Sequence, residues 1–270
     1  MVHQIALNIK YGSRFYVKGG VFMASVSVGG DIHGPLTILE SVQAGGDINI
    51  DNKTETEYLV KYGDTFTYSG GNKSISNYTE GDKIALQSDY HGIDVRDSSF
   101  LVNSGDGALT IENARDKFIG YSTSAETDVV AYSYVASSGG VIDGSDKNVA
   151  EIMYGADNAD NQILAGSGGS SLWGGNGGAD TLVGGDGYDE FIYQAGSGVD
   201  VVQNATSNDV INLLGISLEQ ISNVDVNIGQ VNINFVDGGN LTVEGNTGAG
   251  FKLGNEVYTV NQNTGEWSTK

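Results

Sequence analysis

The 270-residue sequence has no cysteine, one proline and only 13 basic residues against 34 acidic ones. The absence of cysteine excludes disulfides and thiolate metal sites. The formal charge of −21 argues against nucleic-acid binding, because phosphates require a basic surface. No apolar run of about 18 residues is present, so no transmembrane helix is expected. The N-terminal segment lacks the features of a signal peptide, which leaves a cytoplasmic protein, non-classical export and a piece of a longer chain as alternatives.

The acidic charge is concentrated in the second part of the chain. Residues 1–120 carry 15 acidic and 10 basic side chains, whereas residues 121–270 carry 19 and 3. So acidic a segment repels itself as a compact body unless it is disordered or a positive charge neutralises it. Strand-like runs at 231–236 and 241–245 argue against disorder, which favours a bound cation. The alternative is a solvated acidic surface that keeps a secreted protein soluble.

Short segments of alternating apolar and polar residues, separated by Gly, Asn, Asp and Ser, run through the chain. Helical periodicity is scarce, with one short turn expected at 216–221. This pattern predicts an all-β fold. The expected strands are 66–68, 83–86, 99–103, 108–113, 128–135, 190–193, 209–214, 231–235, 241–245 and 256–260.

An internal repeat is also present. Segment 63–84 matches 188–211 at acidic, aromatic and aliphatic positions. Segment 99–113 matches 231–245, and each consists of a strand, an Asp-Gly turn and a second strand, which is typical of a hairpin. The chain is therefore expected to contain two copies of one module. The expected copies are 58–135 and 186–260.

The most informative segment, 154–203, is rich in glycine and aspartate. It follows the nonapeptide G-G-x-G-x-D-x-U-x, in which U is a large apolar residue. Residues 184–192 fit at every position, whereas 165–173 has Ser170 in place of the aspartate. Glycine permits positive φ angles, so a six-residue loop can point its carbonyl oxygens inward, and the aspartate adds carboxylate oxygens. Such hard oxygen ligands suit Ca²⁺, which takes about 6–8 oxygens.

The candidate calcium ligands lie in these loops. Without calcium, their carboxylates would repel one another and a thin core would not repay the ordering entropy, so folding is expected to depend on calcium. One nonapeptide is perfect, so we expect few ions, about one to three. The alternative is a glycine-rich roll that has lost calcium. The candidate ligands are Asp157, Asp160, Gly166, Gly168, Gly175, Asn176, Gly177, Asp180, Gly185, Asp186, Gly187, Asp189, Gly198, Asp200 and Asp209.

These repeats resemble the RTX (repeats-in-toxin, haemolysin-type) calcium-binding family, in the C-terminal region of type I-secreted bacterial proteins. The strict resemblance covers 154–203, and residues 189–213 look like the tail of such domains. Residues 62–86 look like a decayed copy of that tail with Lys73 in place of an aspartate, and 141–155 look like the lead-in strand. The resemblance implies a parallel β-roll or β-solenoid of RTX type with flanking antiparallel strands, Ca²⁺ between its turns, and type I export through an uncleaved C-terminal signal.

Three parts of the chain are therefore expected. Residues 1–57 form an N-terminal β segment, 58–140 a first β module that is a degenerate copy of the RTX tail, and 141–270 an RTX β-roll with a C-terminal β module. Within the first part, the segments 27–32 and 43–48 both contain Gly-Gly-Asp-Ile. Their 16-residue spacing fits either two turns of a β-solenoid or two ordinary hairpins.

No catalytic constellation is visible in the sequence. His3, His33 and His91 are isolated, and the sequence contains no HExxH, G-x-S-x-G or P-loop motif. We therefore expect a non-catalytic calcium-binding module of a secreted or cell-surface bacterial protein, which folds on Ca²⁺ after export and supports structure or adhesion. Expected partners are the type I secretion machinery, cell-surface polysaccharide or other copies of the chain. The alternatives are an accessory domain of a secreted hydrolase or polysaccharide-modifying enzyme, and a self-associating surface-layer or adhesin subunit.

Overall fold

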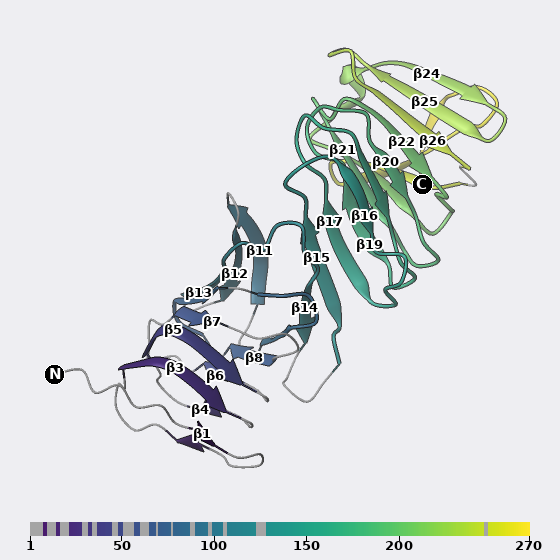
Figure 1. The fold of residues 1–270 in the computed structure, drawn as a ribbon. Helices are drawn as coiled ribbons and strands as arrows, with labels where there is room; N and C mark the ends of the chain where they lie inside the picture. Colours follow the sequence, from purple (N-terminus) through teal and green to yellow (C-terminus); the bar gives the residue numbers. More distant parts are fainter. Residues whose placement is uncertain are drawn as a thin grey trace. The chain divides into compact units, whose positions relative to one another are not determined.

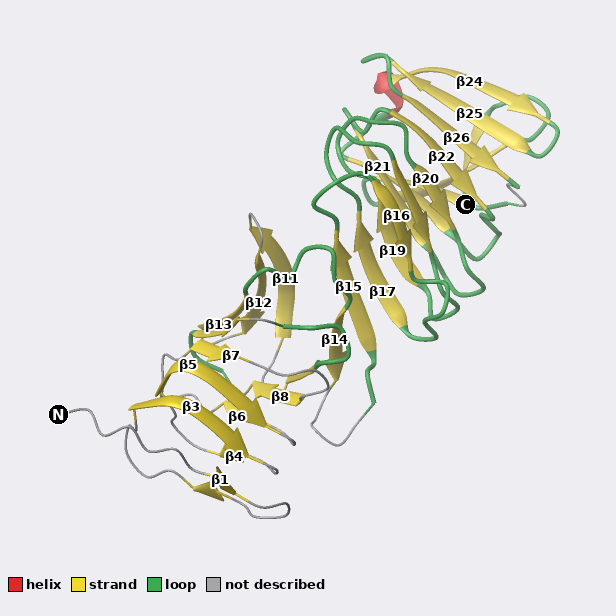
Figure 2. Cartoon of the chain, viewed as in Figure 1, coloured by secondary structure: helices red, strands yellow, loops and turns green. Residues whose placement is uncertain are grey.

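The computed structural model describes residues 65–68, 70–75, 78–86, 107–122, 128–245 and 248–270 with their side chains, and further strands between residues 8 and 104 by their backbone. These residues form β-strands and one short 3-10 helix, η1 (Leu218–Gln220), as Figure 2 shows. The helical turn expected at 216–221 is thereby confirmed. None of the helices in this part of the chain is long and apolar enough to cross a membrane. Two compact units, 1–132 and 133–270, divide the chain.

The second unit is a parallel β-roll, in which successive strands alternate between two sheets (Figure 1). The first sheet contains β17 (Ala150–Tyr154), β19 (Ser170–Trp173), β21 (Glu190–Gln194), β23 (Val210–Leu214) and β27 (Gly250–Leu253), paired in parallel in this order. The second contains β16 (Gly140–Asp143), β18 (Asn161–Leu164), β20 (Thr181–Val183), β22 (Val199–Gln203) and β26 (Asn240–Glu244). The predicted all-β fold with a parallel β-roll is therefore confirmed.

The core of the roll consists of two facing ladders of apolar side chains. Each strand is short and alternates, so every second residue points inward, and one apolar inward residue of each strand belongs to a ladder. Each ladder side chain is at most 3% exposed, and burying one stabilises the fold by about 1.5–3 kcal/mol. The first ladder is Met153, Leu172, Phe191, Ile211 and Phe251. The second is Ile142, Ile163, Leu182, Val202 and Val243.

Antiparallel strands flank the C-terminal end of the roll, as predicted. Strands β24 (Ile221–Asn227) and β25 (Gln230–Phe235) extend the second sheet beyond β26. Strands β28 (Glu256–Val260) and β29 (Trp267–Thr269) extend the first sheet beyond β27. The ring of Tyr193 stacks on Phe235 at a centroid distance of 4.7 Å, and the Trp267 ring meets Phe251 edge to face at 5.3 Å. The Trp267 ring thus covers Phe251, the last residue of the first ladder.

The first unit also consists of strands, and the boundary between the units falls within β15 (Ala131–Val135). One group of paired strands is β1 (Asn8–Ile9), β3 (Phe22–Val28) and β5 (Thr37–Ala44). A second is β2 (Phe15–Tyr16), β4 (Ile32–His33), β6 (Ile48–Ile50), β8 (Thr65–Tyr68), β10 (Lys83–Leu86) and β14 (Ile119–Ser122). A third is β11 (Tyr90–Arg96), β12 (Ser99–Ser104), β13 (Gly107–Ile111), β9 (Lys73–Ser76) and β7 (Glu57–Leu59).

The 16-residue repeat near the N-terminus pairs with itself in parallel register. Ile32 pairs with Ile48, and Val28 pairs with Ala44 one sheet away. Two strands joined as a hairpin would run antiparallel, so these pairings are those of successive solenoid turns. The structure thus has the solenoid arrangement and not the hairpins at this repeat.

The two similar sequence segments share one strand topology. Strands β8 to β14 follow one another as β21 to β27 do. In each copy a three-stranded antiparallel meander precedes the strand that returns to the parallel sheet. The two expected hairpins are present as the antiparallel pairs β12–β13 and β25–β26. The match extends to side chains: the carboxylate of Asp82 accepts hydrogen bonds from the amide and hydroxyl of Thr79, and that of Asp209 from those of Thr206.

Candidate metal centre

The loops of the roll end in buried polar residues at the start of the strands that follow. These residues form two columns, one along the strand starts of each sheet. Strand register aligns the members of a column from turn to turn. Every member is at most 5% exposed. The first column, before the first sheet, is Glu151, Ser170, Asp189 and Asp209. The second column, before the second sheet, is Asn161, Asp180 and Asp200.

Carboxylates of the first column connect neighbouring turns. Asp189 Oδ1 accepts a hydrogen bond from the Ser170 amide of the preceding turn at 2.8 Å. Its Oδ2 accepts one from the Gly185 amide, within its own loop, at 2.8 Å. Asp209 Oδ1 in turn accepts one from the Asp189 amide at 2.9 Å. Each aspartate therefore closes its own six-residue loop and holds the turn before it.

The second column has the same links between neighbouring turns. Asp180 Oδ1 accepts hydrogen bonds from the amide and from the side-chain Nδ2 of Asn161, both at 2.8 Å. Asp200 Oδ1 accepts one from the Asp180 amide at 3.1 Å. Asp180 Oδ2, however, is buried and has no hydrogen-bond partner. An unpaired, buried carboxylate oxygen is costly, so this atom is suited to meet a cation.

The electrostatics of the columns also favour a cation. Burial raises the pKa of Asp180 and of Asp189 to about 6, although hydrogen bonds from Asn161 and from Gly185 partly oppose this. Burial, with the neighbouring Asp180 charge, raises the pKa of Asp200 to about 7. No lysine or arginine of the described chain forms an ion pair with these three carboxylates. Their charged forms therefore lack a positively charged partner, and a bound cation would stabilise them.

Glycine is required in the loops because the turns stack in direct contact. A Cβ atom at Gly174 would overlap Asp180 Oδ2, the carboxylate that folds back over its own loop. A Cβ atom at Gly185 would overlap the carbonyl oxygen of Gly166 in the neighbouring turn. The glycines of the nonapeptide thus allow both the loop closure and the close approach of successive loops.

Gly185→Ala is expected to destabilise the roll by about 3 kcal/mol or more, because the clashing atom belongs to the backbone of Gly166 and cannot rotate away. Gly196→Ala is the control: Gly196 has a φ of 87° but open space around it, so it costs only the backbone strain of about 1–2 kcal/mol. Urea unfolding of both variants measures the difference. Equal losses in the free energy of unfolding for the two variants would show that the close stacking of turns does not require glycine at position 185.

Backbone oxygens line the same loops. The carbonyls of Asn176, Gly178 and Gly196 each accept one amide hydrogen bond from an adjacent turn, at 2.6, 3.2 and 2.7 Å. A carbonyl oxygen has two lone pairs, so each retains one for a further contact. The loops therefore present carboxylate and carbonyl oxygens without nitrogen or sulfur ligands, a donor set that fits Ca²⁺.

The structure divides the predicted ligands between the two edges of the roll. The loops that end in the first column contain Gly166, Gly168, Gly185, Asp186, Gly187, Asp189 and Asp209. The loops that end in the second column contain Asp157, Asp160, Gly175, Asn176, Gly177, Asp180, Gly198 and Asp200. Within the residues that the structure describes, no three His, Cys, Asp or Glu side chains gather to hold a metal ion. An ion at either edge would therefore depend largely on backbone carbonyls.

Two column residues, Asn161 and Glu151, were not predicted from the sequence. Asn161, and not Asp160, is in register with Asp180, while Asp160 is exposed and accepts a hydrogen bond from the Ala179 amide at 2.9 Å. The spacing contained the signal, because Asn161 follows Gly155 by six residues as Asp180 follows Gly174. Glu151 belongs to the lead-in segment outside every nonapeptide, so no repeat signal marked it. Asp157 and Asp186 are exposed loop residues rather than column members.

Comparison with known proteins adds little to this description. No family model and no curated protein matches the chain. One solved structure to which it is similar is the extracellular lipase LipA from Serratia marcescens, at 12% identity and a TM-score of 0.36. The match covers 86% of this chain but 38% of the lipase. Nothing about lipase activity follows for this chain, and membership of the RTX family stays a prediction from the sequence.

Proposed function

We propose that this chain is a calcium-binding β-roll module of a secreted or cell-surface bacterial protein, without catalytic activity of its own. The observation that carries the proposal is the presence of three buried aspartates, Asp180, Asp189 and Asp200, at loop-closing positions without a cationic partner. The second unit as a whole carries 17 acidic and 3 basic residues. Calcium would supply the missing positive charge at the place where the carboxylates are buried.

The proposed role of calcium is to link folding to the environment. In the folded roll, Asp180 Oδ2 and the carbonyls at the loop edges would hold the ion, which would neutralise charge and connect turns. In the unfolded chain these oxygens are dispersed, so binding free energy becomes folding free energy. A chain of this kind would stay unfolded where calcium is scarce and fold outside the cell, which agrees with the type I export that the RTX resemblance implies. Structural support or adhesion would follow from the folded roll.

Calcium is expected to stabilise the purified chain by about 2.7 kcal/mol for each ion at a free concentration one hundred times the dissociation constant. Circular dichroism melts in EGTA and in millimolar CaCl₂ measure this as a higher melting temperature and a gain of β signal. Magnesium at the same concentration is the control, because it demands a tighter octahedral site and gives a smaller shift. Identical melts in EGTA and CaCl₂ would overturn the proposal.

A further inference from the structure

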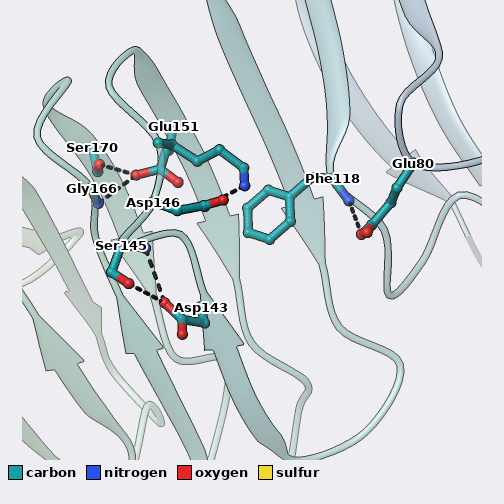
Figure 3. A network of polar contacts seen from close by, with 9 residues as sticks. Glu80, Phe118, Asp143, Ser145, Asp146, Glu151, Gly166 and Ser170 are labelled. Atoms are coloured by element: carbon teal, nitrogen blue, oxygen red, sulfur yellow. Dashed lines mark hydrogen bonds and ion pairs between the residues drawn. The ribbon is translucent and has the colours of Figure 1, made fainter. Parts of the chain in front are cut away.

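Ser170 occupies a column position at which the repeat requires an aspartate. Glu151, one turn earlier, accepts the hydrogen bond that the aspartate would accept. In loop 184–189 the amide of Gly185 donates to Asp189 Oδ2 at 2.8 Å. In loop 165–170 the equivalent amide, that of Gly166, donates to Glu151 Oε2 at 2.7 Å instead. The Ser170 hydroxyl donates to the same oxygen at 3.1 Å. Figure 3 shows Glu151 reaching both partners.

The second oxygen of Glu151 has no partner. Glu151 is 2% exposed, and its Oε1 is buried and accepts no hydrogen bond. The atom lies so close to Gly144 that a Cβ there would overlap it. Burial raises the pKa of this carboxyl, although hydrogen bonds from Gly166 and Ser170 and the charge of Lys147 partly oppose this. A buried, unpaired carboxylate oxygen at the end of a glycine-containing loop is the same feature that marks Asp180.

Two carbonyl oxygens of the same loop lie next to Gly166, whose amide donates to Glu151 Oε2. The carbonyl oxygens of Gly144 and Lys147 both lie against Gly166, where a Cβ atom would overlap that of Lys147. The Gly144 carbonyl accepts one amide hydrogen bond, from Lys147 at 2.8 Å, and so retains a second lone pair, while the Lys147 carbonyl accepts one from Ser167 at 2.9 Å. Asp143 and Asp146, both labelled in Figure 3, add negative charge at the exposed side of the loop. The Lys147 ammonium pairs with Asp146.

We propose that loop 144–151 is an additional Ca²⁺ site, in which Glu151 Oε1 supplies the carboxylate and the Gly144 carbonyl supplies a backbone oxygen. This inference rests on the proposed function of the roll, and it assigns a ligand outside every nonapeptide. The glutamate side chain is one methylene longer than aspartate, which lets Glu151 reach across to the Gly166 amide of the next turn. The first column then keeps its charge at a turn where its own residue is a serine.

Calcium stoichiometry of the full chain tests the site. Isothermal titration with CaCl₂ is expected to give one ion fewer for Glu151→Gln than for the wild type, since the amide keeps the shape but loses the charge. Glu256→Gln, at an exposed position of β28, is the control and is expected to leave the count unchanged. An unchanged count for Glu151→Gln in a wild type that binds calcium would overturn this inference alone. A wild type that binds no calcium would overturn the proposed function with it.

A rescue variant separates ligand loss from a folding defect. Ser170 and Asp189 share a column, so Ser170→Asp places a carboxylate at the regular position of loop 165–170. Glu151→Gln combined with Ser170→Asp is expected to regain the lost ion and its calcium-dependent rise in melting temperature. A double variant that folds, by circular dichroism, but still lacks the ion would contradict the assignment of the charge to this column position.

Discussion

Asp189→Ala is expected to cost about 1.5–4.5 kcal/mol of roll stability even without calcium. The side chain is fully buried, and its two oxygens accept hydrogen bonds from the amides of Ser170 and Gly185. Alanine leaves the Gly185 amide without its acceptor, at about 1–3 kcal/mol. The Ser170 amide keeps a second acceptor, the Tyr188 carbonyl at 3.1 Å, so its lost bond adds about 0.5–1.5 kcal/mol. The loop 184–189 then loses its closure, and the turn before it loses one of its links.

Chemical unfolding in EGTA measures this loss, and a second titration in CaCl₂ measures how much calcium stabilisation survives. Asp225→Ala is the matched control, because Asp225 is exposed on β24 and the substitution removes the same single negative charge. We expect the control to change stability by less than about 0.5 kcal/mol, as is usual for surface positions. A loss at Asp189 no larger than that at Asp225 would mean that the column carboxylates do not hold the turns together.

The architecture was predictable from the sequence because the roll obeys local rules. The apolar U positions of the repeat, such as Leu182 and Phe191, became the two ladders of the core. Asp189 closes its loop through the Gly185 amide, and Asp180 and Asp200 lie buried at the matching loop-end positions, as the nonapeptide predicts. Here each residue's role depends on its own position within a short repeat, so sequence spacing alone carries the information.

The rest of the site depends on which loops lie side by side, and sequence spacing does not report this. Successive loops belong to alternate edges, so the ligand candidates separate into two groups that the sequence presents as one. One inserted residue moved the column position from Asp160 to Asn161. Glu151 reaches Gly166 across a turn, a contact between residues that no motif relates. Such contacts follow from strand register and become visible only once the turns are stacked.

The decayed copy in the first unit offers a natural comparison with the second. Its strands follow the same order, and alignment of Ile75 with Val202 places Lys73 where the roll has Asp200. Lys73 is 5% exposed and Asp200 is 2% exposed, so both positions are buried. The first copy thus has a buried positive charge built into the chain at a position where the second has a buried negative one. We therefore expect the proposed calcium dependence to be a property of the second unit.

The stability of the second unit is expected to respond to pH in opposite directions with and without calcium. In EGTA, the folded state holds protons on Asp180, Asp189 and Asp200 up to about pH 6 to 7, whereas ordinary aspartates lose them near pH 3.8. The folded state therefore binds more protons than the unfolded state in this window, and stability falls as pH rises from about 5 to 7.5. One pKa unit corresponds to about 1.4 kcal/mol, and screening by water leaves an expected total of about 3 kcal/mol.

Saturating calcium is expected to reverse this slope. A bound ion favours the ionised carboxylates, so protons compete with it and stability falls as pH drops from 7.5 to 5. Urea unfolding at several pH values between 5 and 7.5, in EGTA and in CaCl₂, measures both slopes. The pKa values of Asp143 and Glu219 are lowered by hydrogen bonds, so these two groups lose their charge only in stronger acid. Measurements above pH 5 therefore exclude their contribution to either slope.

Asp200→Asn provides the decisive variant, since Asp200 has the highest of the three raised pKa values. The amide cannot ionise, so the EGTA slope is expected to become shallower between pH 6 and 7.5, while Asp225→Asn leaves it as it is. The same variant is expected to weaken the opposite slope in calcium, because it removes a carboxylate that the ion would neutralise. Slopes of the same sign in both media would show that the buried carboxylates titrate without any cation, and that the acidic columns serve the fold through hydrogen bonds alone.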